Sequence, residues 1–503
     1  MDSLLDTSNL SLTFVCLAIS VLVSFCWFYN FSTNSNSSNS SNSNSIPNAT
    51  GAVPLLGHAL QYKRDPTGFI RQQERNTNSK LFRVNMAGRK MIIVGSDPQL
   101  LQQLASMPER WLSSRRAVAD MGFEYVLGRL NVYEGTDWHK KILKNYVAGT
   151  SNNNLASRLP NLYAALQLAM TTEIRKQKEQ QQHPTTASTE GDEQVEIPDL
   201  FSFSRRIALR ATLDEFVSPR LLQQDSKLLE DLMIFQDKLE DAIAQSAVLP
   251  RWLALIFFLR PVQSLREGLQ RRIAKILPII MKEDNSNNKV GPWLQDYQTQ
   301  QTASAIAAEH LIGLIFAAHK NPSIGAAQCL CFLRQELTKE QQQNALREAQ
   351  KLCDMFEAVT TNISENDIDS SQQLLKELLE AKTLRTCVLE TNRLVAHTLG
   401  ALRCAVRNIP VEISPKQQQQ QRQSPRKMVI HAGEAVSFAH HTMHMESSLW
   451  GQDASTFLLD RPEWTSSNDK EGKNQVDIGV PIDQYKYTTF SNGVHKCPGE
   501  RVA

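Results

Sequence analysis

The stretch that decides the fold lies close to the end of the chain and reads Phe490-Ser-Asn-Gly493-Val-His495-Lys-Cys497-Pro-Gly499. Its pattern is F-x-x-G-x-x-x-C-x-G, and glycines permit backbone angles and close approaches that a side chain would block. Two glycines around one cysteine leave backbone amides able to point at the sulfur, as an anionic metal ligand requires. The alternative is that Cys497 is a small buried apolar residue, which is the common situation of a single cysteine. The glycines favour the metal ligand.

Two weaker motifs precede this loop. Glu390-Thr-Asn-Arg393 places an acid and a base at i and i+3, where helical side chains share one face and can pair. Phe457-Leu-Leu-Asp-Arg461 then supplies a second arginine. Taken alone, the first pair could be a surface ion pair, which contributes little stability. The order and spacing of the motifs before the cysteine loop give them more weight.

Together these motifs resemble the cytochrome P-450 superfamily, the haem-thiolate monooxygenases. The resemblance implies that Cys497 is the proximal thiolate ligand of the iron of haem b and that Phe490 packs beside the sulfur. It further implies that His495 reaches a haem propionate, and that Gly493 and Gly499 shape the cofactor-binding loop.

The resemblance also gives roles to residues outside the loop. It implies that Glu390, Arg393 and Arg461 form a buried network that supports the cysteine loop and takes no part in the chemistry. It places Arg403 near a haem propionate, on a strand.

Trp138-His-Lys-Lys141 is similar to the family's helix that contacts the propionates, so Trp138 and Lys141 become candidate cofactor-binding residues. The family often has W-x-x-x-R, and here Ile142 stands at the arginine position, which leaves Lys141 or His139 as the substitute. The alternative is a basic turn on an exposed helix.

Residues 303–332 form a long apolar stretch with few charges, typical of a central buried helix. The resemblance makes it the helix across the distal haem face, where the family has A-G-x-x-T. Ala317 and Ala318 then take the first two positions and Asn321 the threonine position, which makes these three the catalytic candidates. Pro322 has no N–H for the carbonyl of Ala318, so the sequence predicts a bend that would open a groove for oxygen.

Asn321 is the main departure from the family pattern, because an amide donates hydrogen bonds but relays protons poorly. An asparagine at this position resembles the branch that holds the sterol 7α-hydroxylases and prostacyclin synthase. VPLLGHAL, over residues 53–60, is also similar to that branch and to the sterol 14α-demethylases. The branch contains an oxygenase and an isomerase that needs no external electrons, so the residue does not decide between them.

Three functions therefore stay open. The first is a haem-dependent monooxygenase that inserts one oxygen atom from O₂ into a lipophilic substrate, a sterol or another lipid, with electrons from an NADPH–cytochrome reductase or another donor. The second is a reductase-independent isomerase of peroxide lipids, and the third is an inactive haem- or lipid-binding fragment. A nucleic-acid partner is not expected, because 54 Lys and Arg against 52 Asp and Glu leave a net charge of only +2.

The N-terminal segment predicts a membrane anchor. Residues 10–28 are uncharged and long enough to cross the hydrocarbon layer as a helix, with Trp27 and Tyr29 at one end. The alternative is a cleaved signal peptide, which has a basic start and a shorter apolar core, whereas the charges here are Asp2 and Asp6. We expect a single-pass protein of the endoplasmic reticulum with a cytosolic catalytic domain.

The expected organisation is a membrane anchor over residues 1–31, a Ser/Asn-rich tether over 32–50 and the haem-thiolate domain over 51–503. The expected fold is mainly α with small β-sheets, a cytochrome P-450 fold preceded by an N-terminal transmembrane helix. Residues 81–98 alternate like a strand pair turned at Ala87-Gly88, and residues 428–438 contain further short strands. Because the chain stops at Ala503, the C-terminal helix and hairpin of the family fold are expected to be missing.

Overall fold

The computed structural model describes residues 45–134 apart from 55, 152–181, 195–284 apart from 250, 294, 303–361, 368–413, 426–464, 483–497 apart from 484, and 500. Within these ranges the protein is mainly helical and has small β-sheets.

The helices are α2 (Ala59–Arg64), α3 (Pro66–Thr77), α4 (Pro98–Ala105), α5 (Ser114–Asp120), α6 (Phe123–Val126), α8 (Asn152–Gln181), α9 (Leu200–Phe216), α10 (Arg220–Gln224), α11 (Leu228–Val248), α12 (Arg251–Ala254), α13 (Arg260–Asp284), α14 (Ala303–Ala318), α15 (Lys320–Gln335), α16 (Lys339–Thr361), α17 (Ile368–Glu380), α18 (Lys382–Leu394), α19 (His440–His444) and α20 (Ser447–Trp450). Shorter π or 3-10 segments are η1 (Leu130–Glu134), η3 (Leu255–Leu259), η5 (Pro462–Trp464) and η6 (Gly493–His495). The strands are β1 (Leu81–Met86), β2 (Arg89–Val94), β3 (Leu112–Ser113), β4 (Gly400–Ala405), β5 (Ile409–Ile413), β6 (Arg426–Ile430) and β7 (Ala435–Phe438).

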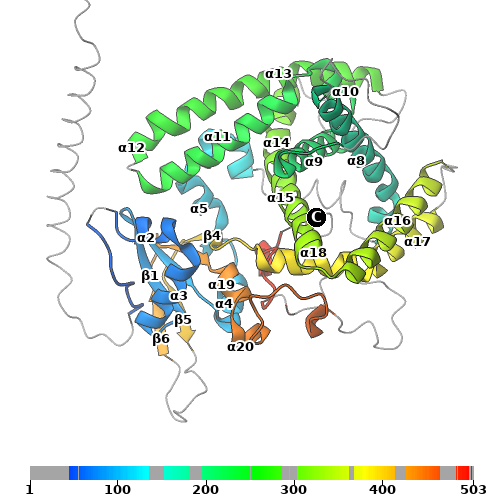
Figure 1. The fold of residues 1–503 in the computed structure, drawn as a ribbon. Helices are drawn as coiled ribbons and strands as arrows, with labels where there is room; N and C mark the ends of the chain where they lie inside the picture. Colours follow the sequence, from blue (N-terminus) through cyan, green and yellow to red (C-terminus); the bar gives the residue numbers. More distant parts are fainter. Residues whose placement is uncertain are drawn as a thin grey trace, which may run out of the picture.

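The sheets gather at one end of the molecule, together with α2 and α3, and the long helices fill the rest (Figure 1). One sheet has the strand order β1-β2-β7-β4-β3, and the other pairs β5 with β6. β1 and β2 form the predicted hairpin, because Ala87 (φ 50°) and Gly88 (φ 92°) both take the left-handed angles that a tight two-residue turn needs. β2 then pairs in parallel with β7, with Met91 opposite Ala435.

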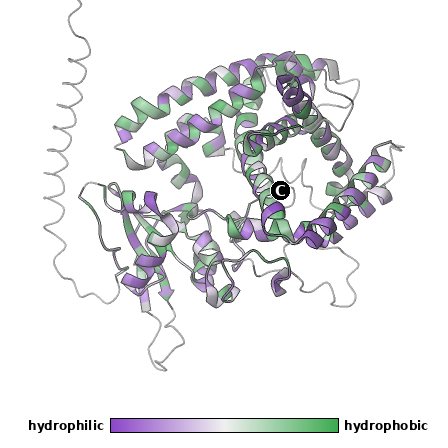
Figure 2. Ribbon diagram, viewed as in Figure 1, coloured by the Kyte–Doolittle hydropathy of each residue, from purple (hydrophilic) through white to green (hydrophobic). Residues whose placement is uncertain are grey.

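The helical core is built mainly from α9, α11, α13 and α14. Leu311, Ile312 and Ile315 of α14 are at most 1% exposed and lie in the middle of this core. α11 and α13 show hydrophilic and hydrophobic residues along their length in Figure 2, as expected of helices with one face on the core. A separate apolar cluster lies under the sheets and includes Leu81, Ile92 and Val436.

The predicted fold class needs one correction, which concerns the transmembrane helix. Among the residues that the structure describes, no helix is both long enough and apolar enough to span a membrane. α13 carries charged residues throughout, a pattern that a hydrocarbon layer does not tolerate, and apolar α14 is only 16 residues long. Residues 10–28, where the span was expected, lie outside the described residues. The architecture that the structure supports is mainly helical with small sheets.

Residues 45–50, which the composition assigned to the tether, pack onto the first sheet. Ile46 is 2% exposed, and Arg83 N–H of β1 donates to the carbonyl of Pro47 at 2.8 Å. The N–H of Ala49 donates to the carbonyl of Arg83 at 2.8 Å. These backbone bonds cover the edge of β1 that has no neighbouring strand. Residues 45–50 therefore belong to the folded domain, which was expected to begin at residue 51.

The apolar stretch 303–332 forms two helices with an interruption between them. α14 ends at Ala318 and α15 begins at Lys320, while His319 takes φ −112° and ψ −39°. Regular helix is interrupted where the sequence predicted a bend, because Pro322 has no N–H with which to bond the carbonyl of Ala318, while the groove for oxygen stays a prediction. Regular bonding resumes when Ser323 donates to the carbonyl of His319 at 3.1 Å.

Candidate functional site

Glu390, Arg393 and Arg461 come together in a buried ionic network, as their motifs predicted. Glu390 and Arg393 are 0% exposed and Arg461 is 3% exposed. Arg393 binds the carboxylate in a bidentate manner, with Nε to Oε2 at 2.8 Å and Nη2 to Oε1 at 2.7 Å. Nε of Arg461 donates to Oε1 at 2.8 Å. The i, i+3 spacing on α18 places the first pair on one face of the helix.

All the N–H donors of the two arginines are used. Those that do not bond Glu390 donate to the carbonyls of Trp450, Asp453, Ala454, Thr456 and His444 and to the carboxylate of Asp453. Buried charges are costly unless they are paired and hydrogen-bonded throughout. Because every donor has a partner, the network holds α18 and the segment that supplies the carbonyls in one arrangement.

His444 connects this network to the segment before the cysteine loop. Its Nδ1 lies 2.9 Å from the carbonyl of Arg393, and its Nε2 accepts the backbone N–H of Thr488 at 2.8 Å. Nδ1 therefore carries the proton, because a carbonyl can only accept. Burial lowers the pKa of His444 to about 3, so the ring is neutral. A neutral histidine with both nitrogens bonded ties α18 to Thr488.

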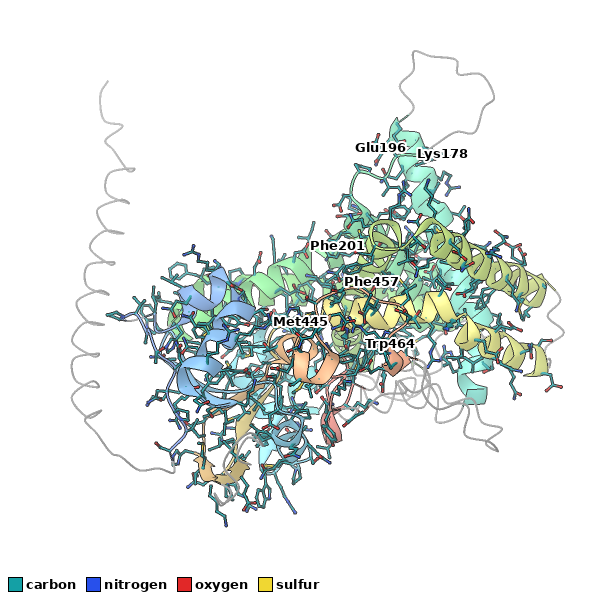
Figure 3. The ribbon with its side chains drawn as sticks, turned by 60° about the horizontal axis from the view of Figure 1, so that its bottom comes forward. Lys178, Glu196, Phe201, Met445, Phe457 and Trp464 are labelled. Carbon is teal, nitrogen blue, oxygen red and sulfur yellow. The ribbon has the colours of Figure 1, made fainter. Side chains whose placement is uncertain are left out.

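Two further bonds hold the same segment against α18. The hydroxyl of Tyr487 donates to the carbonyl of Leu389 at 3.2 Å, and that of Thr489 donates to the carbonyl of Asn392 at 3.2 Å. Phe490 packs on a cluster that contains Leu389, Trp450, Ala454, Trp464 and Tyr487. Figure 3 shows Trp464 close to α18. The loop then closes when Cys497 N–H donates to the carbonyl of Phe490 at 2.7 Å.

Gly493 fixes the loop against the end of α4. It has φ +62°, and a Cβ at this position would lie 2.3 Å from the carbonyl oxygen of Ala105. A side chain is excluded both by the backbone angle and by this contact. The glycine predicted from the motif is therefore required by the packing of η6 on α4.

The thiol of Cys497 is exposed at the end of this segment. The sequence also assigned His495, Gly499, Trp138 and Lys141 to the cofactor site. Gly499, Trp138 and Lys141 lie outside the described residues, and for His495 the structure describes the backbone in η6.

Arg403 and His440 form a second polar group, on β4 and at the start of α19. Arg403 is 6% exposed, and burial lowers its pKa to about 10, with Glu109 opposing the change. His440 Nδ1 lies 2.8 Å from the hydroxyl of Thr488, whereas its buried Nε2 has no partner among the described residues. Burial, with smaller effects of His397 and Arg403, lowers the pKa of His440 to about 3.

Sequence reasoning predicted Arg403 and missed His440. The available signal was the run His440-His-Thr-Met-His444 directly after a predicted strand.

The residues predicted on the distal side lie at the helix interruption. Ala317 and Asn321 are exposed and Ala318 is half-buried, although the preceding turns of α14 are buried. This is the place where the long apolar helix presents an uncovered face.

Charged residues of α11 approach the interruption from its other side. Lys320 pairs with Glu240 and lies 3.6 Å from the carboxylate of Asp237. His319 is fully buried beside Gln236, with 2.9 Å between its Nδ1 and the amide nitrogen. Burial lowers the pKa of His319 to about 4, so this ring is neutral.

No protein-family model matches this chain, and a search of curated proteins gives no significant match. Within the described ranges, no group of three or more His, Cys, Asp or Glu residues is placed to hold a metal ion. The interpretation of the site therefore depends on its own geometry and on the motifs.

Proposed function

We propose that the protein is a haem-dependent monooxygenase that inserts one oxygen atom from O₂ into a lipophilic substrate, a sterol or another lipid. The observation that carries the proposal is the buried network of Glu390, Arg393 and Arg461, which reaches through His444 to the segment before Cys497. A fully satisfied polar network holds its surroundings in one arrangement. An exposed thiol at the end of such a segment suits a large flat cofactor.

Three features fit haem b as the cofactor. The thiol of Cys497 is exposed, the guanidinium of Arg403 is buried with one described hydrogen bond, and Nε2 of His440 is buried without a described partner. Arg403 and His440 would hold the propionates, because guanidinium–carboxylate pairs are strong and directional. When bound, a thiolate-ligated haem supplies the electron density that favours cleavage of the O–O bond.

The residues of the helix interruption would serve the oxygen side. The amide of Asn321 can donate a hydrogen bond, and the small side chains of Ala317 and Ala318 leave room beside it. An amide does not release a proton near neutral pH, so protons must come from water. Lys320, paired with Glu240, connects the interruption to charges at the surface from which such a proton can be drawn.

The proposal includes an electron donor and a membrane as partners. Electrons would come from an NADPH–cytochrome reductase or another donor, at the endoplasmic reticulum with the domain in the cytosol. Trp252, Ile256 and Phe257 of α12 and η3 are 59%, 50% and 63% exposed. Large apolar side chains that face solvent together suit contact with a lipid surface, from which a lipophilic substrate would enter.

Asn321 favours a second candidate, a reductase-independent isomerase of peroxide lipids. Such a reaction takes both oxygen atoms from the substrate and requires no external electrons. It also needs no proton relay to oxygen, which an amide provides poorly.

Spectroscopy of the haem-reconstituted chain tests the shared part of both candidates. Thiolate ligation shifts the Soret band of the reduced, CO-bound protein to the red of that of a histidine-ligated haem. Cys497→Ala should abolish this band, and Cys331→Ala, which removes another exposed thiol, should leave it unchanged. Failure to bind haem, or an unchanged band in Cys497→Ala, would contradict the proposal.

Turnover separates the candidates. Activity that requires NADPH and a reductase supports the monooxygenase, and conversion of a lipid hydroperoxide alone supports the isomerase. Haem binding without either activity would indicate an inactive haem-binding protein.

A further inference from the structure

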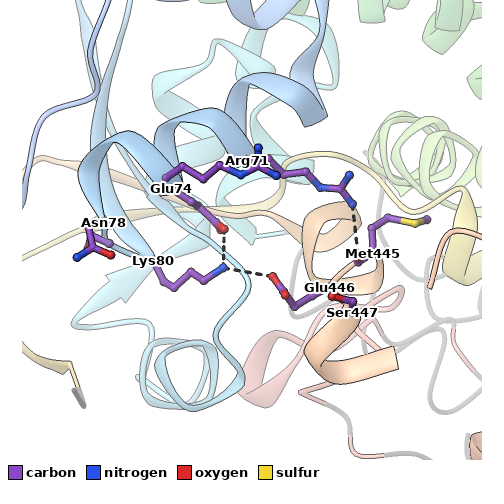
Figure 4. Close-up of a pocket in the computed structure, with 9 residues that line it drawn as sticks. Arg71, Glu74, Asn78, Lys80, Met445, Glu446 and Ser447 are labelled. Atoms are coloured by element: carbon purple, nitrogen blue, oxygen red, sulfur yellow. Dashed lines mark hydrogen bonds and ion pairs between the residues drawn. The ribbon is translucent and has the colours of Figure 1, made fainter. Parts of the chain in front are cut away.

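A polar cavity lies between α3, the start of β1 and the α19–α20 turn, away from the cysteine loop. Its volume is about 540 Å³, within the usual size of a small-molecule site. Its lining includes Arg71, Arg75, Lys80, Glu74 and Glu446 (Figure 4). Such a lining does not suit a lipophilic substrate, so the cavity needs a separate explanation.

The two carboxylates at the base of the cavity already have partners, because they share Lys80 and accept hydrogen bonds from Ser96. Lys80 Nζ lies 2.6 Å from Glu74 and 3.3 Å from Glu446. The hydroxyl of Ser96 donates to Glu446 at 2.8 Å, and its N–H donates to Glu74 at 2.9 Å. Figure 4 shows Lys80 between the two acids. A cation has no unpaired carboxylate to bind here.

The position of Glu74 is also fixed by its neighbour on the chain after β2. A Cβ at Gly95 would lie 1.9 Å from Oε1 of Glu74, so the carboxylate sits directly against the backbone. To pair with an arginine at the mouth of the cavity, Glu74 would have to give up its bonds to Lys80 and to the N–H of Ser96.

Arg71 and Arg75 supply donors that remain available. They stand at i and i+4 on α3 and therefore share one face of the helix. Arg71 donates from Nη2 to the carbonyl of Met445 at 3.3 Å, and neither arginine has an acidic partner among the described residues. Lining residues carry three positive and two negative charges in all, so the cavity is electropositive.

We infer that this cavity binds a phosphomonoester, either on a free small molecule or on a lipid headgroup. Two guanidinium groups present flat arrays of N–H donors that match the three terminal oxygens of such a phosphate. A carboxylate offers two oxygens and a single charge, so it uses fewer of these donors. The volume leaves space for a polar group of small-metabolite size attached to the phosphate.

The cavity is linked to the proposed haem site through one element. Its wall residues Met445 and Glu446 directly follow His444, which bonds both Arg393 and Thr488. A bound phosphate would therefore steady α19 and, through His444, the segment before Cys497. Phosphate binding to the cavity does not depend on haem, so it can be tested independently of the proposed function.

Calorimetric titration of the full chain tests the inference. The probes are glycerol 3-phosphate, inorganic phosphate and acetate, with vesicles of phosphatidylcholine alone or with phosphatidic acid. We expect binding of the phosphate probes and at least tenfold weaker binding of acetate. Arg71→Gln and Arg75→Gln should each weaken phosphate binding about tenfold, the effect of losing a charge-assisted hydrogen bond.

Arg64→Gln is the matched control, because Arg64 is an exposed arginine on α2 that does not line the cavity. Arg75→Lys keeps the charge but loses the planar array of donors, so its affinity for phosphate should lie between those of the unaltered chain and Arg75→Gln. Cys497→Ala should bind phosphate as the unaltered chain does. Binding of glycerol 3-phosphate indicates a soluble ligand, and binding only to phosphatidic acid vesicles indicates a headgroup. Absence of both, equal binding of acetate, or equal loss in Arg64→Gln would overturn the inference.

Discussion

Removal of the buried negative charge of Glu390, which both arginines of its network share, should destabilise the protein strongly. Glu390→Gln keeps the shape of the side chain but removes the only described acidic partner of buried Arg393, and it leaves Arg461 with the half-exposed carboxylate of Asp453 alone. Glu390 accepts from Nε and Nη2 of Arg393, from Nε of Arg461 and from the N–H of Leu458. A glutamine would also point its NH₂ group at an arginine donor.

Breaking a buried ion pair in this way costs about 3–5 kcal/mol. An unfolding entropy of about 2.1 cal/mol/K per residue over 503 residues gives about 1 kcal/mol/K. The melting temperature should therefore fall by about 3–5 °C. Urea denaturation followed by circular dichroism measures the free energy of unfolding, and a thermal melt measures the melting temperature.

Glu380→Gln is the control for the loss of one glutamate charge. Glu380 lies in an exposed pair with Lys376 at 3.9 Å, which contributes at most about 1 kcal/mol. If the Glu390→Gln protein were as stable as the Glu380→Gln protein, the network would not hold the fold together, and the support that we assign to it would be refuted.

Three other outcomes can be measured on the same material. Gly493→Ala should lower the free energy of unfolding by about 1–3 kcal/mol, because its Cβ would meet Ala105, whereas Gly268→Ala, with nothing within 4 Å, should raise it by up to about 1 kcal/mol. Stability should fall as the pH drops from about 6.5 towards 3, because the unfolded chain protonates its histidines near 6.5 whereas folded His440 does so near 3. The free energy of unfolding should change by up to about 1.4 kcal/mol per pH unit for each such histidine, and by less in His440→Gln, as urea titrations at several pH values would show. Phe257→Ala should lower the affinity for lipid vesicles, measured by co-sedimentation, about tenfold, while the free energy of unfolding changes by less than about 0.5 kcal/mol. If the variant and the unaltered chain co-sedimented equally, the proposed contact of Phe257 with a membrane would be wrong.

Features encoded by short spacing could be predicted from the sequence. Glu390 and Arg393 pair because helical geometry places i and i+3 together, and the hairpin turns at Ala87 and Gly88 because few dipeptides accept two left-handed residues. The helix interruption before Pro322 follows from a missing donor. Each of these needs only the residues within one or two turns.

Features that join distant parts of the chain could not be predicted. Arg71 donates to a carbonyl that lies 374 positions further along the chain, and no local pattern encodes the resulting cavity. The role of Ile46 was missed for the same reason, since its Ser/Asn-rich surroundings gave no indication of the sheet edge that buries it. The partner of His440, Thr488, also comes from a remote segment.

The parallel pairing of β2 with β7 has a consequence for synthesis of the protein on the ribosome. β2 ends at Val94, and β7 begins only at Ala435. At translation rates of about 5–20 residues per second, the hairpin waits tens of seconds for its neighbour. During that time Ile92 and Ile93, which end at most 1% exposed, form an apolar open edge in the nascent chain. Newly made copies should thus depend on chaperones until the ribosome has passed β7.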